Sequence, residues 1–137
     1  MMYQQFLDYL QRNQLCEPRD VVLLGVSGGI DSMVMLDLFL RAGFRVGVAH
    51  CNYRLRADES DRDEAFVRQV ARNHQLPFHV QPFDTRDFAE EQGLSVQMAA
   101  RRLRYRWFDK LSDQHGYQAI AIGHNKNDQA ETFLQNM

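Results

Sequence analysis

Two kinds of segment alternate along the chain: short apolar runs and longer amphipathic stretches. The apolar runs cover residues 21–26, 45–50, 76–80 and 118–122. Continuous runs of this kind are typical of strands that are buried on both faces of a parallel sheet. Pro77 lies in the third run and favours a strand start or an edge strand there, because proline cannot donate to a hydrogen-bond ladder.

The amphipathic stretches predict helices, since their apolar residues recur at spacings of three and four. We expect helices over residues 3–13, 85–92 and 95–114, and others that begin near Met33, at Ser60 and at Asp128. Ser60 and Ser95 are suitable N-caps, and Asp63 follows Ser60 at the spacing of a capping box. Alternating strands and helices predict an α/β fold, a doubly wound and mainly parallel sheet with helices on both faces.

Composition limits the class of protein. The chain has 137 residues, of which 45% are hydrophobic and 25% charged, as in an ordinary soluble domain. The net charge of -2 implies that any RNA site is a local patch. Two cysteines, Cys16 and Cys51, form neither a disulfide framework nor a metal motif. Without a membrane-spanning run or a signal peptide pattern, we expect a cytoplasmic protein with no membrane partner.

The sequence Ser-Gly-Gly-Ile-Asp-Ser at residues 27–32 lies between the first strand and the next helix. Backbone N–H groups at such a turn form an anion cradle, and phosphate is the expected anion. Gly28 and Gly29 let the backbone approach the oxygens, the serines offer hydroxyls, and Asp31 can hold Mg²⁺. The loop lacks the lysine of a Walker A motif and the glycine spacing of a dinucleotide fingerprint. A glycine-rich turn that binds nothing is the simpler alternative.

Ligands bind beyond the carboxyl ends of the strands in sheets of this kind. Three polar segments, residues 27–32, 50–56 and 124–131, follow strand ends, and we expect them to converge.

Four segments carry a resemblance to a known family. The loop at residues 27–32 resembles the PP-loop of the ATP pyrophosphatases, which cleave ATP between the α and β phosphates and transfer AMP to a substrate oxygen. Residues 49–56 with 59–61, residues 100–105 and residues 124–132 resemble, in order, three further motifs of the tRNA(Ile)-lysidine synthase family. The resemblance runs from about residue 20 to the end of the chain.

The resemblance implies an enzyme that uses ATP and Mg²⁺ to adenylate the C2 carbonyl oxygen of the wobble cytidine in a minor tRNA(Ile) with a CAU anticodon. The amine of free L-lysine then displaces AMP and leaves lysidine. It also implies that residues 1–137 are a PP-loop catalytic domain truncated at its C-terminus, because the last predicted helix ends without a cap and the family's further domains are absent. A homo-oligomer is left open.

The resemblance assigns candidate residues to four roles. The catalytic candidates are Asp31, Asp128 and Arg104, and the metal candidates are Asp31, Asp128 and Glu131. The ATP-binding candidates are Ser27, Gly28, Gly29, Ile30, Asp31, Ser32, His50, Arg101 and His124. The tRNA-binding candidates are Arg56, Arg102 and Arg106. The chain departs from the family motif at Asn125, where a second histidine is common, and at Asn127, where aspartate is usual; an amide holds Mg²⁺ less well than a carboxylate.

The four arginines at 101, 102, 104 and 106 occupy two faces of the long predicted helix. One face could serve ATP phosphates and the other tRNA phosphates, although a solvated helix surface would have the same pattern. Two other function classes stay open. A PP-loop tRNA thiolase would need cysteines that this chain hardly offers, and a non-catalytic nucleotide-binding module would place its glycine loop late in the chain. Formation of AMP and pyrophosphate from ATP separates an enzyme from a binding module.

Overall fold

The computed structural model describes residues 20–123 and 132–136, and these form one five-stranded sheet in the order β3-β2-β1-β4-β5. Strands β1 to β4 run parallel, and β5 pairs antiparallel with β4. The elements in chain order are β1 (Val21–Gly25), α2 (Ile30–Arg41), β2 (Arg45–Asn52), α3 (Ala57–Asn73), β3 (Phe78–Pro82), α4 (Thr85–Gln92), α5 (Val96–His115), β4 (Ala119–Gly123) and β5 (Thr132–Asn136).

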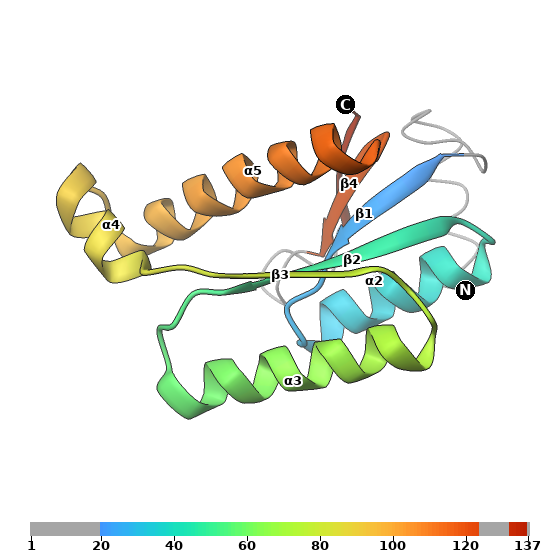
Figure 1. Ribbon diagram of the computed structural model, residues 1–137, viewed down its shortest axis with the longest axis horizontal. Helices are drawn as coiled ribbons and strands as arrows, with labels where there is room; N and C mark the ends of the chain where they lie inside the picture. Colours follow the sequence, from blue (N-terminus) through green and yellow to red (C-terminus); the bar gives the residue numbers. More distant parts are fainter. Residues whose placement is uncertain (1–19, 124–131, 137) are drawn as a thin grey trace.

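Helices cover both faces of the sheet, as Figure 1 shows for α2 and α3 on one side and α5 on the other. On the first face Val22, Leu24 and Val48 pack with Phe39 of α2 and Val67 of α3. On the second face a separate cluster joins residues of three strands and α5, namely Leu23, Ala49, Phe108, Leu111, Ile120 and Ile122. The predicted doubly wound, mainly parallel α/β fold is therefore confirmed, and β3 is an edge strand as Pro77 indicated.

The structure corrects two expected elements. Helix α3 begins at Ala57 with Arg56 as its N-cap, so Ser60 is not the cap; its hydroxyl instead accepts a hydrogen bond from the Arg56 N–H at 3.2 Å. Residues 132–136 form strand β5, where we expected a helix, because pairing with β4 satisfies their backbone groups. Ser95 caps α5 as predicted, accepting from the Met98 N–H at 3.1 Å. The helix expected over residues 3–13 lies outside the described residues.

A cluster of rings closes the second face near the C-terminal end of α5. The Tyr117 hydroxyl lies 2.8 Å from Nε2 of His79 on β3, and the ring of His115 lies 4.7 Å from that of His79. Gly47 of β2 makes room for this cluster, since a methyl group there would overlap the Tyr117 ring and hydroxyl. None of the helices within residues 20–123 is both long enough and apolar enough to cross a membrane.

Candidate functional site

Residues 27–32, called the glycine loop below, connect β1 to α2 and are held by their own serines. The Ser32 hydroxyl accepts from the backbone N–H of Ser27 and of Gly28, each at 3.2 Å, and donates to the Gly29 carbonyl at 3.0 Å. Ser32 is only 2% exposed, so its hydroxyl organises the loop from inside. The sequence suggested instead that this hydroxyl would face a phosphate.

The N-terminus of α2 offers unpaired donors beside this loop. Gly29 occupies the N-cap position and has no side chain to cap the helix. The N–H groups of Ile30, Asp31 and Ser32 have no hydrogen-bond acceptor within the part of the chain that the structure describes. Three free N–H groups at the positive end of a 12-residue helix suit an anion such as phosphate.

Glycines at two points let backbones approach each other around the loop. Gly28 has a φ of +97°, a conformation that other residues rarely adopt. At Gly123, the end of β4, an added Cβ would lie 3.2 Å from the Cα of Ser32 and 3.3 Å from the Asp31 carbonyl oxygen. Strand β4 therefore ends directly against the first turn of α2. The predicted segment 124–131 follows Gly123 in the sequence and lies outside the described residues.

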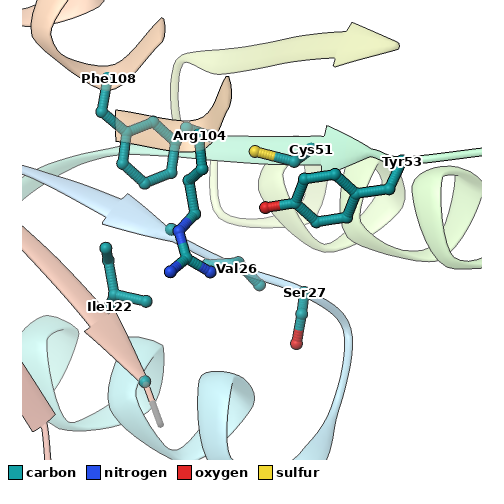
Figure 2. A pocket seen from close by; sticks show the side chains of 10 residues that line it. Val26, Ser27, Cys51, Tyr53, Arg104, Phe108 and Ile122 are labelled. Atoms are coloured by element: carbon teal, nitrogen blue, oxygen red, sulfur yellow. The ribbon is translucent and has the colours of Figure 1, made fainter. Parts of the chain in front are cut away.

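An open cavity of about 80 Å³ adjoins the glycine loop on the α5 face of the sheet. Its walls come from the ends of three neighbouring strands and from α5, and Figure 2 draws the ten lining residues and labels seven of them. The lining residues are Gly25, Val26, Ser27, Ala49, Cys51, Tyr53, Arg104, Phe108, Ile122 and Gly123. The volume is small beside the roughly 300–1,000 Å³ of typical small-molecule sites. The cavity can thus hold one part of a ligand whose phosphates reach the glycine loop.

Arg104 is the one charged side chain among the residues that line this cavity. Its Nε is buried and has no hydrogen-bond partner among the described residues. The guanidinium also lies 5.3 Å from the centre of the Tyr105 ring. A partly buried guanidinium without a carboxylate partner in the cavity lining suits an anionic ligand, which would satisfy its buried Nε.

Cys51 and Tyr53 add two neutral polar groups opposite Arg104. Burial raises the pKa of the Cys51 thiol to about 12, while a hydrogen bond from Tyr53 and the charge of Arg104 act in the opposite direction. A thiol with so high a pKa stays protonated and is a weak nucleophile. Burial also raises the pKa of Tyr53, followed in size by the effect of Cys51, so its hydroxyl remains neutral.

His50 and Asn52 alternate with these residues along β2 and therefore face the other side of the sheet. His50 is 3% exposed, and its Nδ1 lies 2.8 Å from the Val26 carbonyl oxygen. It joins β2 to the end of β1 and is absent from the cavity lining, where we expected it to be. Its neighbours Cys51 and Tyr53 line the cavity in its place.

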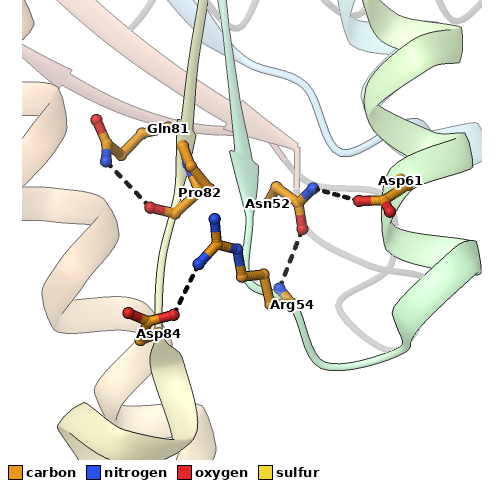
Figure 3. A network of polar contacts seen from close by, with 6 residues as sticks. All are labelled: Asn52, Arg54, Asp61, Gln81, Pro82 and Asp84. Carbon is orange, nitrogen blue, oxygen red and sulfur yellow. Dashed lines mark hydrogen bonds and ion pairs between the residues drawn. The ribbon is translucent and has the colours of Figure 1, made fainter.

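Asn52 holds the turn that follows β2. Its amide donates to Asp61 Oδ1 and to Glu64 Oε1 of α3, both at 3.1 Å, and its Oδ1 accepts from the Arg54 N–H at 3.0 Å. Arg54 has a φ of +54° and pairs with Asp84 at 2.7 Å. Figure 3 shows this network running from α3 across the turn to the start of α4.

Of the four helix arginines only Arg104 lines the cavity; Arg101, which we expected to share the ATP face with it, is exposed and absent from the lining. Arg104 lies on the cavity side, whereas Arg102 and Arg106 are exposed. Arg106 packs over the Phe88 ring of α4 at 5.6 Å, and Arg101 over Tyr105 at 5.2 Å. Arg56 lies across the sheet at the start of α3, where it pairs with Glu59 at 3.4 Å.

The structure thus brings together the glycine loop and Arg104 among the predicted site residues. His124, Asn125, Asn127, Asp128 and Glu131 lie outside the described residues, so their roles stay predictions. Sequence reasoning missed Cys51, Tyr53 and Phe108. The period of two along β2 was the signal that could have identified the first two, since it separates residues 49, 51 and 53 from His50 and Asn52.

Comparison with known proteins finds a matching family model and several relatives that share one name. A family model described as a PP-loop domain matches residues 2–137. The chain is 40% identical over 137 residues to the tRNA(Ile)-lysidine synthase of Bacteroides thetaiotaomicron, covering 100% of this chain and 32% of that protein. The proteins of the same name from Parabacteroides distasonis and Chlorobaculum tepidum are 43% and 44% identical over 94% and 97% of this chain. This chain covers 30% and 41% of those two proteins, so it spans about a third of the curated relatives it matches.

Solved structures share the fold at low sequence identity. The NH3-dependent NAD synthetase of Campylobacter jejuni superposes with a TM-score of 0.61 and 17% identity, over 93% of this chain and 57% of that chain. The NMN synthetase of Francisella tularensis has the same TM-score and identity, over 88% of this chain and 51% of that chain. These likenesses concern the arrangement of the sheet and helices.

Proposed function

Because this chain belongs to the PP-loop domain family, we propose that it binds ATP at the glycine loop and supports formation of lysidine in a tRNA(Ile). The observation that carries the proposal is the juxtaposition of two anion-seeking features at one strand end. These are the unpaired N–H groups of residues 30–32 and the cavity that holds Arg104. The names of the relatives supply the reaction, since those proteins are tRNA(Ile)-lysidine synthases.

The proposed reaction has two steps. The C2 carbonyl oxygen of the wobble cytidine attacks the α-phosphorus of ATP, and pyrophosphate leaves. The amine of free L-lysine then attacks C2 and AMP leaves, because adenylation has turned a poor leaving oxygen into a good one. The N–H groups at the start of α2 bind phosphate oxygens, and the Arg104 guanidinium offsets the negative charge that develops during the attack.

Asp31 is the residue proposed to hold Mg²⁺ in this scheme. It lies in the first turn of α2, beside the N–H groups that favour an anion. A carboxylate and a polyphosphate at the same helix end would repel each other, and a divalent cation between them removes that repulsion. Asp128 and Glu131 are the further candidates from the sequence. The cation, when bound, would neutralise phosphate charge.

The tRNA is proposed to contact the exposed arginines around the same edge of the sheet. Arg102 and Arg106 lie on α5 and Arg56 lies at the start of α3, so these arginines belong to the two faces of the sheet. A ligand as large as a tRNA can span both sides while one nucleotide enters the cavity. ATP, lysine and tRNA meet in the cytoplasm, which is where we place the reaction.

Incorporation of labelled lysine into a minor tRNA(Ile) transcript with a CAU anticodon tests the proposal. The assay uses the protein as its gene encodes it, with ATP and Mg²⁺. Asp31→Ala is expected to remove incorporation, whereas Asp37→Ala is the matched control because Asp37 lies further along α2, exposed and paired with Arg41 at 3.0 Å. Formation of AMP with a different acceptor, and no lysine incorporation, would contradict the lysidine assignment and retain ATP cleavage.

A further inference from the structure

The Arg104 guanidinium lies in a cavity without an acidic side chain. Among the residues that line it, the other polar side chains are Ser27, Cys51 and Tyr53. A carboxylate partner would fix the guanidinium but would also cancel the charge that a phosphate needs. A neutral hydroxyl can accept a hydrogen bond from arginine and leave the charge intact.

Tyr53 is the neutral group best placed for that task. Figure 2 shows its hydroxyl facing the Arg104 side chain, with the Cys51 sulfur nearby. Arg104 and Cys51 line the same cavity as Tyr53, and both lie close enough to its hydroxyl to influence its pKa. Since arginine only donates, the phenolic oxygen is the acceptor that this pair can use, and the phenolic O–H stays free to point to the Cys51 sulfur.

The ring of Tyr53 is itself held in place from two sides. It stacks on Phe83, with ring centres 5.9 Å apart and planes inclined by 23°. The turn behind it is fixed by the hydrogen bond from the Arg54 N–H to Asn52 and by the ion pair of Arg54 with Asp84 (Figure 3). Phe83 and Asp84 are neighbours in the sequence, so the stack and the ion pair tie the same two segments together.

We propose that Tyr53 is a positioning residue, whose hydroxyl holds the Arg104 guanidinium toward the glycine loop for the attack on ATP. The proposal rests on the proposed use of ATP at this site. Tyr53 affects the reaction only by orienting Arg104. The stack on Phe83 and the Asn52–Arg54–Asp84 network in turn fix the position of the Tyr53 ring.

Tyr53→Phe tests this role because it keeps the ring and the stack and removes the hydroxyl alone. We expect AMP formation from ATP in the presence of tRNA to fall about tenfold in kcat, the effect of one hydrogen bond to a charged group. The KM for ATP should change less than twofold. Trp107 is the only tryptophan of the sequence, and it packs 5.7 Å from Phe108 of the cavity, so its fluorescence can report Mg-ATP binding independently of turnover.

A double-mutant cycle separates positioning from a structural effect. In an Arg104→Lys background, Tyr53→Phe is expected to lower kcat no further, because lysine lacks the planar guanidinium that the hydroxyl orients. The proposal would be overturned if Tyr53→Phe lowered kcat equally in the wild-type and Arg104→Lys proteins, or if it did not lower kcat in the wild-type protein. Tyr117→Phe is the matched control: it removes a hydroxyl that bonds His79 outside the cavity and should leave AMP formation unchanged.

The assay also distinguishes this inference from the proposed function. Lysine incorporation by the wild-type protein is measured in parallel, and its absence would contradict lysidine formation alone. The Tyr53 effect is read from AMP formation, which any adenylating enzyme of this class produces.

Discussion

Helix α5 contributes to two polar clusters, and these differ in how far their groups are satisfied. In its N-terminal half, the Nε of Arg104 is buried, and neither it nor the N–H groups of residues 30–32 has a hydrogen-bond partner among the described residues. At its C-terminal end His115 packs on His79, whose Nε2 meets the Tyr117 hydroxyl at 2.8 Å.

The difference separates a ligand site from a structural contact. A buried polar atom without a partner costs about 1–3 kcal/mol, and the Nε of Arg104 is such an atom inside the cavity. The cluster of His79, His115 and Tyr117 has partners within itself and therefore needs no ligand. We expect changes at the first cluster to affect turnover and changes at the second to affect stability.

The largest effect should come from Gly28→Ala. The residue has a φ of +97°, so alanine strains the loop and moves the N–H groups that face the phosphate. We expect kcat/KM for AMP formation to fall about a hundredfold, equivalent to about 2.7 kcal/mol, with a loss of about 1–2 kcal/mol in unfolding free energy. Urea unfolding and the turnover assay measure the two quantities.

Gly43→Ala is the control for that change. Gly43 also has a positive φ, +82°, but it lies after the end of α2 with no atom within 4 Å of an added Cβ. It should show a similar loss of stability with unchanged kcat/KM. If Gly28→Ala and Gly43→Ala lowered kcat/KM equally, the loss of activity would follow from reduced stability and not from a change in the glycine loop.

Gly47→Ala should break the second cluster and leave the first intact. An added methyl would overlap Tyr117, and overpacking of this kind costs about 1–3 kcal/mol. Activity per folded molecule should stay at the wild-type value. Calorimetry of Gly47→Ala, alone and combined with Tyr117→Ala, measures the effect, and the second substitution should relieve part of the strain. No relief would show that the Tyr117 ring is not the obstacle.

The contact between Gly47 and Tyr117 marks a limit of sequence reasoning. Apolar runs and caps predicted the parallel strands, α4, α5 and the glycine loop, because short-range patterns determine those elements. Gly47 and Tyr117 are 70 positions apart in the sequence. Their contact depends on how the sheet and α5 pack together, and no local sequence pattern predicts that packing. The same holds for the strand at residues 132–136, whose state depends on pairing with β4.

The start of α3 was missed for a different reason. Arg54 and Ala57 adopt φ values of +54° and +43°, which sequence rules reserve mainly for glycine and asparagine. The backbone N–H groups of Arg54 and Arg56 donate to the side-chain oxygens of Asn52 and Ser60, and these bonds stabilise the turn only in the folded chain. The cavity side chains Cys51 and Tyr53 were not predicted, because the motif favoured His50, which precedes Cys51 on β2 and faces the other side of the sheet.

A smaller effect on stability should appear when the pH is lowered and His79 of the second cluster becomes protonated. Burial, and secondly the charge of His115, lower the pKa of His79 below its ordinary 6.5. The unfolded chain then binds the proton first as pH falls, so stability decreases from pH 6.5 down to the folded pKa and levels off below it. One proton gives at most about 1.4 kcal/mol per pH unit, and partial exposure of His79 reduces this further.

Urea unfolding at a series of pH values below neutrality measures that loss. His115→Gln should make the loss shallower, because it removes the neighbouring charge that opposes protonation of His79. Tyr117 is the other polar group that contacts His79, and its own pKa is raised by burial, so it stays neutral over this range. An identical pH dependence with and without His115 would contradict the coupling of the two rings.

The smallest effect concerns the outer face of α5. Arg102 is exposed and makes no ion pair with the residues that the structure describes, so its charge is available to a phosphate of the tRNA. Arg102→Gln should weaken tRNA binding a few-fold and lower the slope of log K against log salt by about 0.7–0.9 for one lost phosphate contact. Arg72→Gln, at the far end of α3, should leave the slope unchanged. A slope that does not change for Arg102→Gln would assign this arginine to the solvent and leave Arg56 and Arg106 as the arginines proposed to contact the tRNA.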